Sequence, residues 1–231
     1  METLGRETDP QVVERLLRQR YSCRSFRENP VPRETIEAVL ASAQRTGSWC
    51  NVQPWAVVVT SGNATDRVRT ALHAAAAASE KATMELPPPA EYRGIYLDRR
   101  RAAGFGLYAA LGIARDDRAA RERQMLENYR MFRAPHLALI SSPRELGTYG
   151  AIDCGAYIAN FLLAATAHGL GTIAMASITR YPAILRGALP VPESHNLVAG
   201  IAFGYACGDA PANAFRTDRE DVAGAVEWVE I

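Results

Sequence analysis

Four short apolar runs, separated by longer segments with helical spacing, limit the fold of this chain more than any other feature of its sequence. Each run has the length of one strand, and turn residues such as Ser61 and Gly62 bound the first of them. The runs are residues 56–60, 137–142, 172–175 and 197–204. The pattern predicts buried strands that alternate irregularly with helices. At 231 residues, with nothing that divides the chain, we expect one domain.

The segments between these runs indicate helices through apolar residues at spacings of three and four. The most apolar of them carries Ile158, Phe161, Leu162 and Ala165 on one face and ends at Gly169. Residues 86–117 are irregular, and we expect a mobile excursion with short helices there, followed by a polar tail at the C-terminus. The other expected helices are residues 10–20, about 32–46, a segment starting near 63, 117–132 and 181–188.

Composition argues against several classes of function. The formal net charge of +1 provides no overall field for nucleic acid or an anionic membrane. No run approaches the ~20 apolar residues of a membrane span, and the N-terminus lacks the apolar core of a signal peptide. The four cysteines lie far apart without a CxxC pair or a histidine at ligand spacing, so we expect reduced thiols and no metal site. These features predict a cytoplasmic protein.

A short segment after the first helix, residues 20–26 (RYSCRSF), combines two arginines with two hydroxyl side chains. Arg20 and Arg24 stand four residues apart, with Ser22 between them. Guanidinium and hydroxyl groups in one turn suit a phosphate or an anionic ring edge. The alternative is that both arginines only complement the negative end of the preceding helix dipole.

A second polar segment, residues 47–55 (GSWCNVQPW), precedes the first buried strand. Its Asn51 and Gln53 side chains both donate and accept hydrogen bonds, which recognition of a uracil-like edge requires. The alternative is a capping loop in which Pro54 and Trp55 pack against the core.

These two segments resemble the nitroreductase family, in which an arginine-x-serine-x-arginine-x-phenylalanine run is followed by a serine-x-x-asparagine-x-glutamine-proline-tryptophan loop. Residues 153–172 (DCGAYIANFLLAATAHGLGT) resemble the long central helix of the family, and residues 199–205 (AGIAFGY) resemble its last core strand. The resemblance spans nearly the whole chain. Residues 205–217 are most similar to the nitrobenzoate-reductase-like branch.

The resemblance implies an α+β fold of the nitroreductase type, with a mixed, mainly antiparallel sheet flanked by helices. It further implies a domain-swapped homodimer with two FMN molecules at the subunit interface. Residues 1–231 would form the single FMN-binding domain. Residues of about 86–132 would form a variable excursion over the substrate pocket, and residues of about 206–231 would extend onto the partner subunit.

The resemblance also assigns roles to individual residues of this chain. Arg20 and Ser22, with Tyr21 between them, would hold the FMN phosphate and ribityl chain together with Arg216, while Arg24 would approach the pyrimidine edge of the flavin. Three residues would come from the partner chain: Ser48, Asn51 and Gln53.

Two further segments complete the predicted site. Asn128 and Arg130 would supply an amide and a cation to the flavin ring, although a solvated helix face is the alternative for this charged segment. The loop with Ala176 and Ser177 resembles the one whose backbone N–H contacts flavin N5.

No amino-acid side chain is expected to act as a catalytic acid or base, because FMN would carry the redox chemistry. The implied activity is reduction of small electron-poor compounds, such as nitroaromatics or quinones, by NADH or NADPH in a ping-pong mechanism. Because no GxGxxG element follows a strand, the nicotinamide would be a visiting substrate. Alternatives are an FMN-dependent oxidase, dehydrogenase or dehalogenase on the same scaffold, and a flavin-binding protein without turnover.

Overall fold

A four-stranded antiparallel sheet forms the centre of the molecule in the computed structural model, which describes residues 7–230. The strand order is β1-β2-β4-β3. The strands are β1 (Ala56–Thr60), β2 (His136–Pro143), β3 (Gly171–Met175) and β4 (His195–Gly204). All three strand pairs are antiparallel, and within residues 7–230 the parallel pairing is an isolated bridge between Ser22 and Thr172. The four predicted strands are therefore confirmed, to within one or two residues at most ends.

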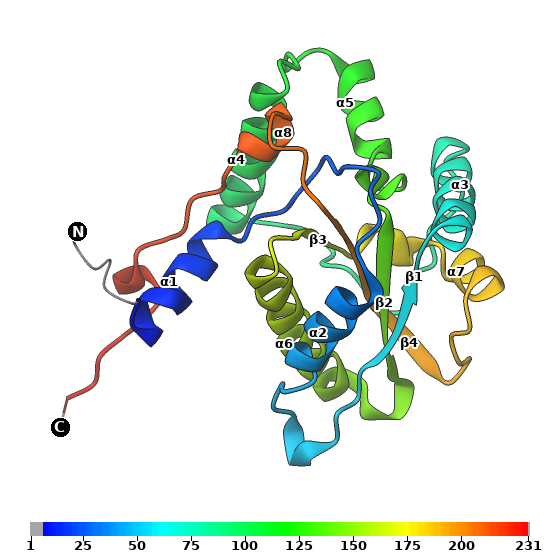
Figure 1. Ribbon diagram of the computed structural model, residues 1–231. Helices are drawn as coiled ribbons and strands as arrows, with labels where there is room; N and C mark the ends of the chain where they lie inside the picture. The colour runs from blue at the N-terminus through cyan, green and yellow to red at the C-terminus, as the bar shows by residue number, and fades with distance from the viewer. Residues whose placement is uncertain (1–6, 231) are drawn as a thin grey trace, which may run out of the picture.

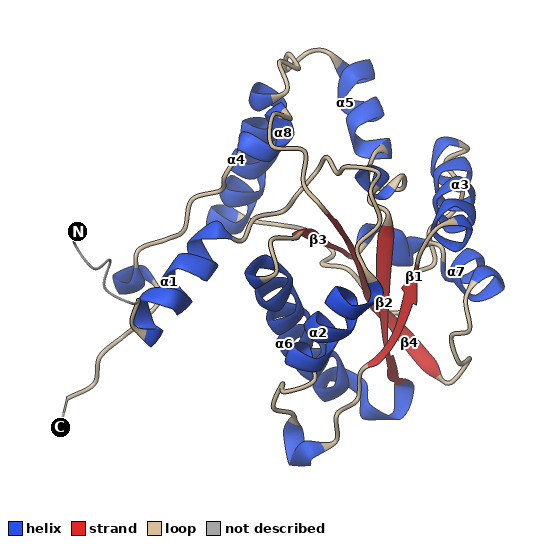
Figure 2. Ribbon diagram, viewed as in Figure 1, coloured by secondary structure: helices blue, strands red, loops and turns tan. Residues whose placement is uncertain are grey.

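Helices cover both faces of the sheet, as Figure 2 shows. On one side, the core joins α3 and α7 to β2 residues such as Leu137 and Leu139. On the other side, α2 and α6 pack against Ala138 and Ile140 of the same strand. Because successive side chains of a strand point to opposite faces, a strand covered on both sides is apolar throughout. This double coverage explains why the strands appear in the sequence as continuous apolar runs.

The helices agree with the predicted segments except between residues 86 and 132. They are α1 (Asp9–Gln19), α2 (Arg33–Ala43), α3 (Asn63–Ala77), α4 (Gly94–Ala110), α5 (Arg118–Leu126), α6 (Gly147–Ala167), α7 (Pro182–Ala188) and α8 (Pro211–Ala214). The expectation of only short helices in the excursion was wrong, because α4 is 17 residues long. The C-terminal tail, expected to be only polar, contains the short α8.

The predicted helix over residues 117–132 is also too long, since α5 ends at Leu126. Met131, Phe132 and Arg133 have φ angles of 53°, 49° and 62°, which a right-handed helix cannot contain. Burial of Met131 and Phe132 in the core holds this unfavourable backbone.

Three helices project away from the sheet and are largely exposed. Neither α1, α4 nor α5 has a buried residue, and Figure 1 shows α1 and the C-terminal segment extending away from the sheet. Large apolar side chains are exposed there, including Leu17 (53%) and Trp228 (81%). Exposed apolar area of this extent is typical of an interface rather than of a free surface.

The helical stretch Arg144–Ala167, which contains α6, is long and apolar enough to cross a membrane by length and composition alone. The core helix of a soluble protein can have the same length and composition. Tyr157 and Phe161 of α6 are fully buried against the sheet side of the protein, so at least one face of this helix belongs to the protein core.

Candidate functional site

The segment with Arg20, Ser22 and Arg24 runs along the edge of the sheet, where Ser22 forms a β-bridge with Thr172 of the edge strand β3. Cys23 N–H donates to the carbonyl of Thr172 at 2.8 Å, and Cys207 N–H donates to the carbonyl of Ser25 at 3.0 Å. Gly171 is required beside it, since a Cβ there would lie 2.9 Å from Cys23 Sγ. The segment is thus fixed by backbone hydrogen bonds to β3 and to the residues after β4.

Asn213, in α8 of the C-terminal segment, holds this loop from the other side. Its Oδ1 accepts the Arg24 N–H at 2.7 Å, and its Nδ2 donates to the carbonyls of Ser25 (2.8 Å) and Cys207 (2.9 Å). The side chain is only 4% exposed. Sequence reasoning assigned no role to Asn213, because nothing local indicates partners about 190 residues away.

Arg20, Arg216 and Arg219 lie where the 20–26 loop meets the C-terminal segment. The guanidinium carbon of Arg216 lies 3.7 Å from the centre of the Tyr21 ring. Burial lowers the pKa of Arg20, and the positive charges of Arg219 and Arg216 lower it further. No ion pair within residues 7–230 joins any of the three guanidinium groups to a carboxylate. An anion placed among them would relieve their mutual repulsion and accept charge-assisted hydrogen bonds.

Unsatisfied hydroxyl groups lie on β3 and directly after it. Thr172 forms a backbone β-bridge with Ser22. Its side-chain Oγ1 and the Oγ of Ser177 are both buried without a hydrogen-bond partner in residues 7–230. Ala176 precedes the 3₁₀ turn Ser177–Arg180. Because buried polar groups in proteins are nearly always hydrogen-bonded, these hydroxyls are suited to a polar ligand.

Arg24 has its guanidinium close to its own loop, donating to the carbonyl of Ser22 at 3.1 Å. Burial lowers its pKa, but an arginine remains protonated at neutral pH because its usual pKa lies several units above neutrality. The structure therefore places Arg20, Tyr21, Ser22, Arg24 and Arg216 in one region.

The loop with Ser48, Asn51 and Gln53 lies elsewhere in the chain, beside the start of α6 (Figure 1). Ser48 Oγ accepts the Gln53 N–H at 2.9 Å, and Asn51 and Gln53 have positive φ angles of 58° and 50°. The buried carboxylate of Asp153 accepts the N–H of Trp49 at 3.2–3.3 Å. Asp153 thus fixes a loop whose polar side chains are largely exposed, and within one chain this loop does not meet Arg20 or Arg216.

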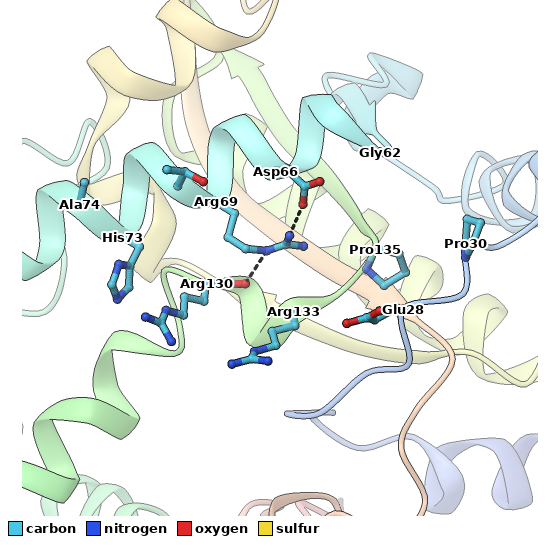
Figure 3. Close-up of a pocket in the computed structure, with 11 residues that line it drawn as sticks. Glu28, Pro30, Gly62, Asp66, Arg69, His73, Ala74, Arg130, Arg133 and Pro135 are labelled. Atoms are coloured by element: carbon cyan, nitrogen blue, oxygen red, sulfur yellow. Dashed lines mark hydrogen bonds and ion pairs between the residues drawn. The ribbon is translucent and has the colours of Figure 1, made fainter.

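Asn128 and Arg130 are not brought to the arginine cluster either. Asn128 Nδ2 donates to the carbonyl of Met125 at 2.9 Å, as a cap of α5. Arg130 pairs with Glu127 at 3.1 Å and lines a cavity of about 900 Å³ beside α3. Figure 3 shows Arg130 and Arg133 pointing into this cavity, with Arg69 hydrogen-bonded to the Arg130 carbonyl behind them. The lining includes none of the residues of the 20–24 loop.

Comparison with known proteins gives the family directly. A model of the nitroreductase family matches residues 17–205. The chain belongs to the nitroreductase family. It is 39% identical to nitroreductase NfnB of Mycolicibacterium smegmatis over 210 residues. This alignment covers 90% of this chain and 89% of the relative. It is 34% identical to a 4-nitrobenzoate reductase of Nocardioides sp., over 92% of this chain and 87% of the relative.

The fold of this nitroreductase agrees with that of a solved relative. The crystal structure of the FMN-dependent nitroreductase NfnB from Mycobacterium smegmatis in complex with NADPH superposes with a TM-score of 0.90 at 36% identity, covering 96% of this chain and 99% of that one. The family and the nitrobenzoate-reductase-like branch predicted from the sequence are therefore confirmed.

Proposed function

We propose that this nitroreductase is an FMN-dependent NAD(P)H oxidoreductase that reduces nitroaromatic compounds. Its relatives include reductases of 4-nitrobenzoate and nitrobenzene, and a structural relative is described as FMN-dependent and binds NADPH. The observation in this chain that carries the proposal is the cluster of three arginines, in which Arg216 stacks on Tyr21 and the charges of Arg216 and Arg219 act on Arg20. Three cations without an acidic partner favour a bound anion, and the FMN phosphate satisfies this requirement.

The residues present fit FMN. Arg20 and Arg216 would bind the phosphate with Tyr21 and Ser22 beside the ribityl chain, and Arg24 would face the pyrimidine edge of the ring. Bound FMN supplies the ability to take a hydride from a nicotinamide and pass electrons to an oxidant. A guanidinium at the pyrimidine edge stabilises negative charge on the ring and thereby raises its reduction potential. The unpartnered Ser177 hydroxyl lies in the segment predicted to contact N5.

The complete site is proposed to need a second copy of the chain. Beyond the face that packs on the sheet, α6 presents a second apolar face with Tyr149 (57% exposed) and Ile152 (58% exposed), continued by Ala156 and Ala159. A homodimer formed through this face would cover it and bring Ser48, Asn51 and Gln53 of one subunit to the flavin of the other.

Residues 206–220 of the tail contact the 20–26 loop and α4 of their own chain. The extension onto the partner subunit, expected for about residues 206–231, is therefore proposed for the residues after Glu220. The exposed Trp228 supports this arrangement, because a free surface rarely exposes so large an apolar side chain beside other apolar residues. We infer that α6 serves this dimer in the cytoplasm and not a membrane.

Asn128 and Arg130 stay in the proposal as flavin ligands only if the excursion moves when the cofactor binds. Asn128 caps α5, and Arg130 faces the cavity beside α3. Arg24 is the cation proposed for the ring edge, because it lies in the same loop as Arg20 and Ser22.

An anaerobic titration of the purified yellow protein tests the function. We expect NADH or NADPH to bleach the flavin absorbance and 4-nitrobenzoate to restore it, as ping-pong turnover requires. Failure of both nicotinamides to reduce the flavin would favour an oxidase or dehydrogenase. Reduction without turnover on nitroaromatics or quinones would favour a flavin-binding protein. Protein that retains no flavin after gel filtration with excess FMN would contradict the proposal.

A further inference from the structure

Helix α4 of the excursion is joined to the C-terminal segment through a glycine. A methyl group added at Gly106 would lie 2.5 Å from Cε2 and 2.8 Å from Cζ of Phe215. The Phe215 ring therefore sits where only a residue without a side chain permits it. Figure 1 shows α8 and the residues after it lying along α4.

A second contact ties the same face of α4 to the same segment. Arg99 Nη2 and Glu220 Oε2 are 2.6 Å apart. Arg99 and Gly106 are two helical turns apart, so they share one face of α4, and their partners follow in reverse order along the tail. Both members of the ion pair are half-exposed, and such a pair contributes little. The contact between Gly106 and Phe215 is therefore the stronger of the two, and it forms the main joint between α4 and the C-terminal segment.

The backbone of Phe215 leads directly to the proposed phosphate ligand. Arg216 Nη1 donates to the carbonyls of Phe215 (2.9 Å) and Asn213 (2.6 Å), and its guanidinium stacks on Tyr21. These bonds set where the guanidinium points. The position of the Phe215 ring against α4 thus determines the orientation of Arg216.

We propose that Gly106 is a positioning residue for the FMN phosphate: the notch at Gly106 seats Phe215, and Phe215 fixes the Arg216 guanidinium. This inference rests on the proposed function, in which Arg216 binds that phosphate. It makes cofactor affinity depend on the helix that the sequence places over the substrate pocket. Because binding linkage is reciprocal, bound FMN also stabilises the docking of α4.

Two glycines of α4 allow a matched test. A methyl group added at Gly104 would meet nothing within 4 Å, whereas one at Gly106 would meet the Phe215 ring. Gly104→Ala and Gly106→Ala bring the same gain in helix propensity, so they differ mainly in the contact with Phe215. Each protein is freed of flavin, and the Kd values for FMN and for riboflavin, which lacks the phosphate, are measured. Melting temperatures check that each variant folds.

We expect Gly106→Ala to raise the Kd for FMN by about fivefold or more, as overpacking in a close contact does. The Kd for riboflavin should stay near the wild-type value. Gly104→Ala should leave both Kd values unchanged. In Gly106→Ala/Phe215→Leu, the smaller side chain should recover part of the FMN affinity, since the two changes are coupled. If Gly106→Ala fails to fold, Phe215→Ala tests the same joint.

An equal loss of FMN and riboflavin affinity in Gly106→Ala would overturn the inference, because it indicates general damage. The same holds for equal effects of Gly104→Ala and Gly106→Ala. Arg216→Ala separates this inference from the proposed function. If Arg216→Ala abolishes the preference for FMN over riboflavin and Gly106→Ala does not reduce it, only the joint is wrong. If Arg216→Ala keeps that preference, the phosphate assignment itself is wrong.

Discussion

Asn213 Oδ1 accepts the backbone N–H of Arg24 at 2.7 Å, across 189 residues of chain. The same side chain satisfies the carbonyls of Ser25 and Cys207. A single buried amide therefore joins the loop that carries Arg20 and Arg24 to the segment that carries Arg216. Together with the backbone hydrogen bond from Cys207 to Ser25, this amide holds the two segments of the proposed phosphate site against each other.

Asn213→Ala should destabilise the protein and weaken FMN binding together. The Arg24 N–H would lose its hydrogen-bond acceptor, which costs about 1–3 kcal/mol if water cannot replace it. The carbonyls of Ser25 and Cys207 would each lose one of their donors. Urea denaturation gives the free energy of unfolding, and flavin fluorescence gives the Kd. Exposed Asn63→Ala on α3 is the control and should change neither. Wild-type stability in Asn213→Ala would show that the amide does not hold the two segments together.

Asp153→Ala should loosen the loop with Ser48, Asn51 and Gln53. Its carboxylate accepts the N–H of Trp49 and is nearly buried. Without that acceptor, the loop has fewer constraints on its positive φ angles. Hydrogen exchange followed by mass spectrometry should report faster exchange of residues 47–53, with residues 136–143 of β2 unchanged. Unchanged exchange in the loop would argue that its own bonds, such as Gln53 N–H to Ser48 Oγ, are sufficient.

His136 should make stability depend on pH. The ring is 2% exposed, with Nε2 accepting the Val31 N–H at 2.9 Å and Nδ1 3.2 Å from the Thr60 carbonyl. Burial lowers its pKa below the usual 6.5. Below pH 6.5 the unfolded chain therefore binds a proton that the folded chain does not, and the free energy of unfolding falls as pH decreases towards the folded pKa.

Urea denaturation between pH 7.5 and 5.0 measures this dependence, which is at most about 1.4 kcal/mol per pH unit for one proton. His136→Gln should have a smaller slope below pH 6.5, while exposed His168→Gln should keep the wild-type slope. An NMR titration that places the His136 pKa at or above 6.5 would contradict the assignment.

Ile152→Glu should convert the proposed dimer to a monomer that has lost most of its flavin. A carboxylate at the centre of an apolar contact is costly to bury, and each site would lose Ser48, Asn51 and Gln53 of the partner. The molecular mass measured by analytical ultracentrifugation should fall from twice 25.2 kDa to 25.2 kDa. Thr70→Glu, at an exposed position of α3 on the opposite side of the sheet, brings the same change of charge and is the control. A dimeric, yellow Ile152→Glu protein would move the interface away from this face of α6.

Local signals in the sequence predicted much of the fold. The strands were identifiable because burial on both faces makes them continuously apolar, and α1 and α2 followed from their apolar spacing and from the prolines near their first residues. Helix α4 was missed because its glycines, Gly104 and Gly106 among them, count against a helix locally. Its glycine at 106 is explained only by Phe215, which is more than 100 residues away.

For the candidate site too, the sequence predicted one part and only the tertiary structure decided the other. The sequence by itself determined the family and the motif residues Arg20, Ser22, Arg24 and Arg216, because their spacing is a property of the chain. Only the tertiary structure decided that Arg216 stacks on Tyr21, that Asn213 ties the two segments together, and that Arg130 faces a different cavity. Those relationships depend on contacts between residues far apart in sequence, and no local periodicity records such contacts.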